Sequence, residues 1–212
     1  MRKTRKEARK RREWERRHAD LLQAAADLFH AHGYEETSVQ AVAERAGFSV
    51  GYLYKHFPGK PELLEAVLMV FFHTVERIRS EVSEDVDLSP LSQVRLELVR
   101  ICEFLAENAP LVLVFAQHEN RLAPRLQGRL DKLRRYEVLR LRNAHAVGEI
   151  PPVNFGLLAA TIDGVFLNLV RRYVGAPPAE GLSRIPEIVD QFILRPLEER
   201  SQRNPGKEYS NA

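Results

Sequence analysis

Apolar residues recur at steps of three and four positions through most of the 212-residue chain, which is the spacing of one face of an α-helix. No stretch alternates apolar and polar residues in the manner of a half-buried β-strand. The first helical series runs from Trp14 to Phe29, and Gly33 stands where a helix is expected to stop. The pattern predicts an all-α protein of about nine helices.

Two short helices are predicted directly after the first. Thr37 stands where an N-cap residue belongs and would open a helix over residues 38–45, which ends before Gly47. Ser49 would cap the next helix, over residues 49–57. The short loop between them brings the two helices close together.

The rest of the chain predicts longer helices separated by polar or Pro-rich linkers. Residues 83–90, SEDVDLSP, are polar and acidic and form the clearest linker, and GEIPPVN and GAPPAEG interrupt the chain again further on. The longer helices are predicted over residues 62–82, 91–105, 111–118, 122–146, 154–174 and 183–195.

The two short helices have the spacing of a helix-turn-helix unit. Gly47 lies in the turn, and the small Ala46 before it permits close packing. The second helix of such a unit lies in the DNA major groove, with its N-terminal residues nearest the base edges. This placement accounts for residues 51–60, GYLYKHFPGK, in which Leu53 and Phe57 are inward anchors among hydroxyls, cations and an imidazole.

Residues 21–68 resemble the DNA-binding domain of the tetracycline-repressor-like (TetR) family of bacterial transcription regulators. The chain departs from the family pattern at Val42, Phe48 and Tyr52, where Ile, Val and Thr are usual, and Tyr52 alters the predicted reading surface. The matching positions are Ala24, Ala25, Leu28, Phe29, Gly33, Thr37, Ala43, Ala46, Gly47, Ser49, Gly51, Leu53, Tyr54, His56, Phe57, Lys60 and Leu63.

The elements and the resemblance together suggest two domains between two terminal segments. We expect residues 1–14 to form a flexible basic arm and residues 15–75 a DNA-binding domain with its motif at 38–57. Residues 83–200 would form a ligand-binding and dimerisation domain, as the resemblance implies, and residues 201–212 a disordered tail.

Ten residues of the DNA-binding domain are predicted to contact DNA, and they fall into two classes because base contacts specify a sequence whereas phosphate contacts position the protein. The predicted base-edge or groove contacts are Gln40, Ser49, Val50, Gly51, Tyr52 and Lys55. The predicted phosphate contacts are Thr37, Tyr54, His56 and Lys60.

The predicted helices 154–174 and 183–195 are the candidate homodimer interface, because one is apolar nearly all round and the other is strongly striped. The resemblance implies a cytoplasmic repressor that binds a palindromic operator as a homodimer and is released by a small-molecule effector. An activator, or a ligand-independent DNA-binding protein of the same fold, is the alternative. The candidate effector-pocket residues are Phe104, Phe115, His118 and Tyr136.

Charge is concentrated at the N-terminus. Residues 1–18 contain ten Lys or Arg and three Glu, which gives this segment a net charge of +7 in a chain whose total is +3. A basic segment on an otherwise acidic body favours a polyanionic partner, so RNA and anionic membranes stand beside duplex DNA as alternatives. The helix-turn-helix favours duplex DNA, because the major groove of A-form RNA does not admit a helix.

An enzyme is the remaining alternative, and the sequence offers little for it. The tetrapeptide PGKP at residues 58–61 lacks the Gly spacing and the Ser or Thr of a phosphate-binding loop, and no nucleophile elbow or HExxH motif occurs. The seven histidines show no i, i+4 pairing, so we expect no catalytic residue, metal site or cofactor. Cys102, the only cysteine, lies in an apolar helical stretch and is expected to be a buried structural thiol.

Overall fold

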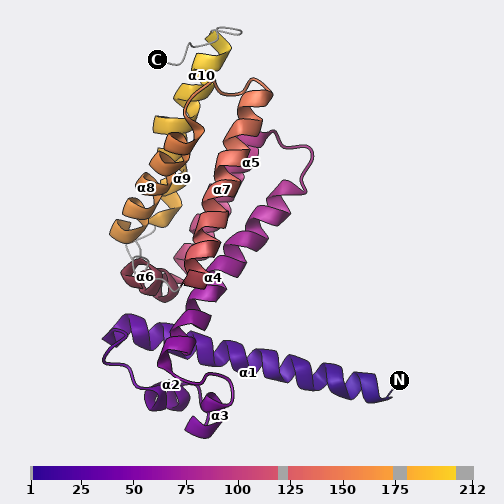
Figure 1. The fold of residues 1–212 in the computed structure, drawn as a ribbon, viewed down its shortest axis with the longest axis vertical. Coiled ribbons are helices and arrows are strands. Elements are labelled where there is room, and N and C mark those ends of the chain that lie inside the picture. The colour runs from indigo at the N-terminus through magenta and orange to yellow at the C-terminus, as the bar shows by residue number, and fades with distance from the viewer. Residues whose placement is uncertain (1, 119–123, 174–180, 204–212) are drawn as a thin grey trace. The chain divides into compact units, whose positions relative to one another are not determined.

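The computed structural model describes residues 2–118, 124–173 and 181–203, which form helices joined by loops with no strand among them (Figure 1). The prediction of an all-α fold is confirmed for these residues. Contacts divide the chain into two units, residues 1–71 with 110–123 and residues 72–109 with 124–212.

The first unit contains the three N-terminal helices, the beginning of a long helix and a short later one. Apolar side chains fill its interior, among them Leu21, Phe29, Val42, Leu53 and Leu63, which are almost fully buried. Burying such side chains is the dominant stabilising contribution in a small helical unit. Its helices are α1 (Arg2–His32), α2 (Val39–Arg45), α3 (Val50–Tyr54), the start of α4 (Lys60–Ser83) and α6 (Ala109–His118).

Residues 2–14 are helical, which corrects the expectation of a flexible arm, because α1 runs without a break from Arg2. Lys, Arg, Glu and Ala make up most of this segment, and all are strong helix formers. An ion pair four residues apart adds support, with Arg11 Nε 2.8 Å from Glu15 Oε1. The charge density that suggested disorder therefore coexists with high intrinsic helix propensity.

The N-cap of α2 is Ser38, whose Oγ accepts a hydrogen bond from Ala41 N at 3.1 Å, and the expectation that Thr37 caps this helix is wrong. Thr37 is buried, and its hydroxyl donates toward the Gly33 carbonyl oxygen at 2.7 Å and that of Leu28 at 3.1 Å. Ser and Thr are both good N-caps, so the pattern could not distinguish two adjacent hydroxyl residues. Thr37 instead satisfies carbonyls at the end of α1.

The second unit is a set of helices packed side by side, in which α7 contacts α5 and α8 while α9 contacts α5 and α8 (Figure 1). Ser89 caps the first of them, as its place in the linker predicts. The elements are the end of α4, α5 (Pro90–Glu107), α7 (Pro124–Ala146), α8 (Phe155–Tyr173), a 3₁₀ turn η2 (Leu182–Arg184), α9 (Ile185–Val189), a π-helical turn η3 (Asp190–Leu194) and α10 (Arg195–Arg203).

The C-terminal helical segment is longer and less regular than the predicted helix 183–195. It passes through 3₁₀, α and π geometry before α10, and it continues to Arg203. Polar contacts hold the extension, since Arg95 Nη2 lies 2.6 Å from Glu198 Oε2 and the Ser201 hydroxyl donates to a carbonyl oxygen at 2.7 Å. Residues 204–212 of the predicted tail lie outside the described residues.

Cys102 is buried on α5, as expected for a structural thiol. Burial, with a smaller contribution from Glu103, raises the pKa of the Cys102 thiol to about 12. Because the thiolate is the nucleophilic form, this cysteine is chemically inert near neutral pH.

Candidate nucleic-acid interface

The turn between α2 and α3 is fixed by the backbone and by one hydroxyl. Gly47 has a φ of 74°, a left-handed conformation that favours glycine, and Phe48 N donates to Ala43 O at 2.8 Å across the turn. Ser49 then caps α3, its Oγ accepting a hydrogen bond from Tyr52 N at 3.2 Å. These contacts set the start of α3, which is the end that a helix-turn-helix directs toward base edges.

Two apolar residues anchor α3 and leave the rest of it available. Leu53 and Phe57 are buried, as the sequence predicts. A Cβ added at Gly51 would meet no atom within 4 Å, so the fold itself does not require glycine there. Of the remaining predicted DNA contacts, Gln40, Ser49, Gly51, Tyr54 and Lys55 are exposed, and Val50, Tyr52 and His56 are half-buried.

A cluster of rings ties α3 to α1. The ring of His56 has its centroid 4.7 Å from that of Tyr52, 5.5 Å from that of Trp14 and 6.0 Å from that of His18. Tyr52 also stacks on Phe48, with ring centroids 5.0 Å apart. Burial, and secondarily the nearby His56, lowers the pKa of His18 below 6.5. We call Trp14, His18, Phe48, Tyr52 and His56 the ring cluster.

Arg17 extends the ring cluster with a cation. Its guanidinium carbon lies 5.8 Å from the centre of the Tyr52 ring. A hydrogen bond to Tyr52 and then the charge of Glu13 raise the pKa of Arg17. The sequence placed Tyr52 at the reading surface, and the structure adds contacts to α1 that only three-dimensional packing reveals. Trp14, Arg17 and His18 were therefore missed, although their spacing of three and four residues puts them on neighbouring faces of one helix.

Two predicted phosphate contacts are already engaged within the protein. Lys60 Nζ donates to the carbonyl oxygens of Tyr34 at 2.8 Å and Glu35 at 2.9 Å, and it lies 4.5 Å from the centre of the Tyr34 ring. Thr37 is buried with its hydroxyl directed at α1. The side chains of both residues contact the loop between α1 and α2, and their role as phosphate contacts stays a prediction.

Similarity to known proteins covers both this interface and the wider fold. Residues 21–67 match the model of "Bacterial regulatory proteins, tetR family". A solved regulator, the TetR family protein PfmR from Thermus thermophilus, is 26% identical with a TM-score of 0.72, over 82% of this chain and 97% of that one.

Residues 21–67 carry the TetR-type DNA-binding domain, and the described fold is that of a TetR-family structure.

Two curated relatives agree with this assignment. The probable regulator ArpR of Pseudomonas putida is 33% identical over 110 residues, 51% of this chain and 49% of the relative. The repressor KstR of Rhodococcus jostii is 40% identical over 81 residues, 38% of this chain and 37% of the relative. The match therefore spans half or less of the length of these two relatives, and both carry the name of an HTH-type regulator of transcription.

The residues predicted to line a TetR-type effector pocket stay a prediction, and the structure gives the surroundings of three of them. Phe104 is half-buried on α5, and Phe115 is buried with its ring stacked on Phe71 at 4.5 Å between centroids. The side chain of His118 lies outside the described residues. A hollow of about 390 Å³ lies elsewhere, lined by Arg134, Val138, Gly156, Ala159, Ala160, Asp163, Gly164 and Leu167 of α7 and α8.

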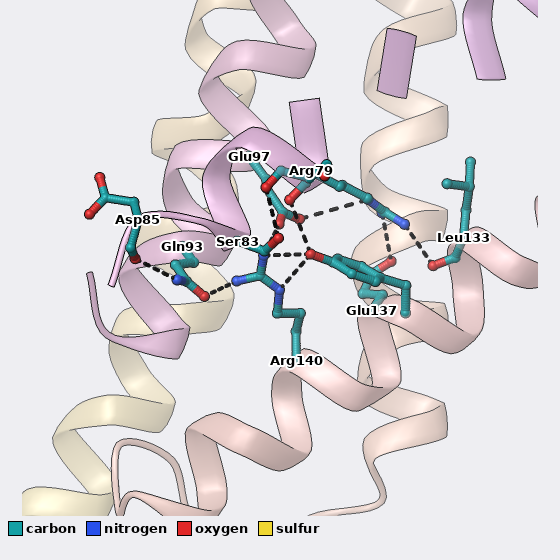
Figure 2. A network of polar contacts seen from close by, with 10 residues as sticks. Arg79, Ser83, Asp85, Gln93, Glu97, Leu133, Glu137 and Arg140 are labelled. Carbon is teal, nitrogen blue, oxygen red and sulfur yellow. Dashed lines mark hydrogen bonds and ion pairs between the residues drawn. The ribbon is translucent and has the colours of Figure 1, made fainter. Parts of the chain in front are cut away.

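Tyr136, the remaining pocket candidate, hydrogen-bonds to members of a buried ionic network. Figure 2 shows this network, in which Arg79 of α4, Glu97 of α5 and Arg140 of α7 meet. Arg140 Nη2 lies 2.7 Å from Glu97 Oε1, and both side chains are buried. Arg79 lies 3.7 Å from Glu97 and 3.9 Å from Glu137. The Tyr136 hydroxyl accepts from Arg140 Nε at 3.0 Å and donates to the Arg79 carbonyl oxygen at 3.2 Å, which places this ring among charges.

The carboxyl groups of this network hold protons more tightly than free carboxyl groups. Burial raises the pKa of Glu97 above 4.5, against the opposing charges of Arg140 and Arg79. Burial also raises the pKa of Glu137 well above 4.5, and the hydrogen bond and charge of Asp163 act in the same direction. Two neighbouring carboxyl groups favour sharing a proton, because two like charges close together repel.

The described residues contain no group of three or more His, Cys, Asp or Glu placed to hold a metal ion. No helix in the same part of the chain combines the length and apolarity needed to cross a bilayer.

Proposed function

We propose that this protein is a sequence-specific, duplex-DNA-binding regulator of transcription that reads base edges with the exposed face of α3. The observation that supports this proposal most strongly is that α3 is anchored on one face and exposed on the other. Leu53 and Phe57 hold the helix from below, while Ser49, Gly51 and Lys55 are exposed around its N-terminal half and its end. A helix anchored on one side and polar on the other fits the major groove of B-DNA, which is about 12 Å wide.

The contacts divide between specificity and positioning. Lys55 and Gln40 are exposed and offer donors to base edges, where a bidentate side chain discriminates by about 1–3 kcal/mol. Tyr54, which is 49% exposed, and His56 at the C-terminal end of α3 are positioned for phosphates. Phosphate contacts fix the register of the helix and add affinity that does not depend on sequence.

A homodimer follows from the need for specificity and from an uncovered face. One helix-turn-helix reads only a few base pairs, so two copies on a palindrome are needed, with half-sites about 34–36 Å apart. Leu157 on α8 is 66% exposed and Phe192 on η3 is 70% exposed. A second copy of the chain would cover these apolar side chains.

A matched pair of charge substitutions tests the dimer. Leu157 on α8 is 66% exposed and Leu139 on α7 is 55% exposed. Leu157→Glu should make the protein monomeric in sedimentation without unfolding it, and Leu139→Glu should leave the dimer intact. A wild-type monomer at micromolar concentration would overturn the proposal.

The relative KstR is named a repressor, and we extend that role to this chain, with a small molecule that releases the protein from DNA. Such an effector must bind the DNA-incompatible arrangement more tightly, typically by about 1–3 kcal/mol of coupling. The 390 Å³ hollow between α7 and α8 falls within the usual range of ligand sites, about 300–1,000 Å³, and offers Arg134 and Asp163 as polar groups.

A thermal-shift screen followed by DNA release identifies the effector. A compound that stabilises the protein and lowers operator affinity is the effector, whereas one that only stabilises it is not. Arg134→Ala should weaken binding if the hollow is the site, and Phe104→Ala should do so if the predicted aromatic pocket is the site. Transcription in vitro from the bound promoter then separates a repressor from an activator.

Selection from a pool of random duplexes tests DNA recognition itself. The expected result is a palindromic sequence that the protein protects in a footprint. Recovery of no preferred sequence would contradict the proposal. Tighter binding to RNA or to anionic vesicles than to any duplex would favour the alternatives that the basic N-terminus leaves open.

A further inference from the structure

One row of side chains on α1 is continuous with the ring cluster. Its members are Lys6, Lys10, Trp14 and His18. Residues four apart on an α-helix are neighbours, so this row follows one inclined ridge that turns by about 120° around the helix between Lys6 and His18. Trp14 and His18 both contact the ring of His56, which lies immediately after α3. The row therefore leads from the recognition helix to the cationic end of α1.

The two lysines of this row are exposed and have no acidic partner among the side chains that the structure describes. Arg11, by contrast, is paired with Glu15 on another face of the same helix. Two cations four residues apart repel each other and oppose helix formation. The structure shows no ion pair of Lys6 or Lys10 with a described side chain, so their charges remain available to an anionic partner.

The helical form of this segment decides how it can meet DNA. An α-helix with its side chains is about 10–12 Å across, whereas the minor groove of B-DNA is about 6 Å wide. A helical N-terminus therefore cannot lie in the minor groove as an extended arm does. It can lie along the outside of the duplex, where its lysines meet phosphate oxygens.

The length of the row sets its reach. Lys6 precedes His18 by twelve residues, which corresponds to about 18 Å at roughly 1.5 Å per residue. At about 3.4 Å per base pair, this distance covers roughly five base pairs. Because His18 contacts the residue that follows α3, Lys6 reaches beyond the bases that α3 itself can touch.

We propose that Lys6 and Lys10 bind phosphates of the duplex that flanks the half-site, so that α1 extends the binding site outward by about five base pairs on each side. This inference rests on the proposed DNA binding by α3. The contacts within the ring cluster fix the direction of α1 relative to α3, and Trp14 is the member of the cluster that comes first in the chain.

Duplexes of two lengths test the proposal once a preferred sequence has been selected. One contains only the palindrome, and the other carries eight extra base pairs of unrelated sequence at each end. The variant is Lys6→Gln/Lys10→Gln. The charge-matched control is Arg135→Gln/Arg142→Gln, which removes two exposed cations from α7. Lys6→Arg/Lys10→Arg keeps both charges, and circular dichroism verifies that every variant retains its helix content.

The wild type and the control should bind the flanked duplex at least tenfold more tightly than the short one, with a steeper salt dependence. Lys6→Gln/Lys10→Gln should remove this advantage and lower the salt slope by about one unit for each phosphate that the variant no longer neutralises, and Lys6→Arg/Lys10→Arg should restore it. Equal affinity of the wild type for both duplexes overturns the inference while leaving α3 recognition intact. Failure to select any sequence overturns the proposed function instead.

Discussion

The two units of the molecule differ in whether they bury charged side chains. Among the side chains that the structure describes in the first unit, the buried ones are apolar apart from Thr37, and cations such as Lys10 and Lys55 are exposed. In the second unit Glu97 and Arg140 are buried against each other between α5 and α7. Charge at the surface is available to a partner, whereas buried charge must be paired within the fold. The exposed cations of the first unit are therefore available to an external anion. The buried pairs of the second unit instead fix its helices relative to one another.

The largest expected effect comes from breaking the buried network. Arg140→Ala removes the closest partner of Glu97 and a donor to Tyr136, and leaving a buried charge without its partner costs about 3–5 kcal/mol. Chemical denaturation followed by circular dichroism measures the loss. Arg142→Ala, an exposed arginine of the same helix, is the control and should change stability by less than about 0.5 kcal/mol. Equal small effects of the two substitutions would mean that the network does not hold the helices.

A smaller effect is expected for Lys60, which bridges two carbonyl groups in the first unit. Lys60→Ala should destabilise this unit by about 1–2 kcal/mol, because it removes two charge-assisted hydrogen bonds at a partly exposed site. Fluorescence of Trp14, the only tryptophan, reports the unfolding of this unit. If Lys60→Ala leaves stability unchanged but reduces DNA binding and the salt slope, the lysine is a phosphate contact after all.

The opposite pattern is expected for Lys55, whose replacement should change DNA binding and not stability. It is exposed at the end of α3, and Lys55→Ala should leave stability unchanged. Binding to the selected duplex should weaken by about 1–3 kcal/mol, with relaxed preference at one base pair of each half-site. Competition with duplexes substituted at single positions measures the preference. A uniform loss across all sequences would show that Lys55 contacts phosphate and not a base.

The smallest effect concerns the carboxyl pair of Glu137 and Asp163. Because burial raises the pKa of Glu137 in the folded state, its favourable contribution to folding is complete below pH 4.5 and declines as pH rises from 4.5 through its folded pKa. Glu137→Gln keeps a hydrogen-bond donor and removes this titration. The melting temperature of the variant should fall less steeply with rising pH than that of the wild type. Glu107→Gln, an exposed control, should follow the wild type.

The contrast between the units also explains what the sequence could predict. The caps and the turn glycine depend on local backbone geometry, so Ser49, Gly47 and the anchors Leu53 and Phe57 were identified correctly. The choice between Ser38 and Thr37 failed, because both residue types suit an N-cap and only tertiary burial separates them. A sequence predicts a cap or a turn correctly when only one nearby residue suits that position.

The sequence did not predict contacts between residues that are far apart in the chain. Arg79, Glu97 and Arg140 come from three helices, and nothing in their local sequence distinguishes them from ordinary surface charges. Tyr136 was assigned to an apolar pocket for its ring, although its hydroxyl joins it to this network. Lys60 was likewise assigned by motif, and its partners lie 25 and 26 residues earlier. Long polar side chains have too many candidate partners for spacing alone to choose among them.

The affinity ratio between the selected duplex and a scrambled duplex of equal length tests the central claim most directly. Measured at about 0.15 M salt, the wild-type protein should prefer the selected sequence by at least roughly 10³-fold, which is the lower range of specific recognition. Lys55→Ala should reduce that ratio, and Lys6→Gln/Lys10→Gln should lower both affinities while preserving it. A ratio near one for the wild type would contradict base reading by α3 and leave only non-specific attraction between cations and phosphates.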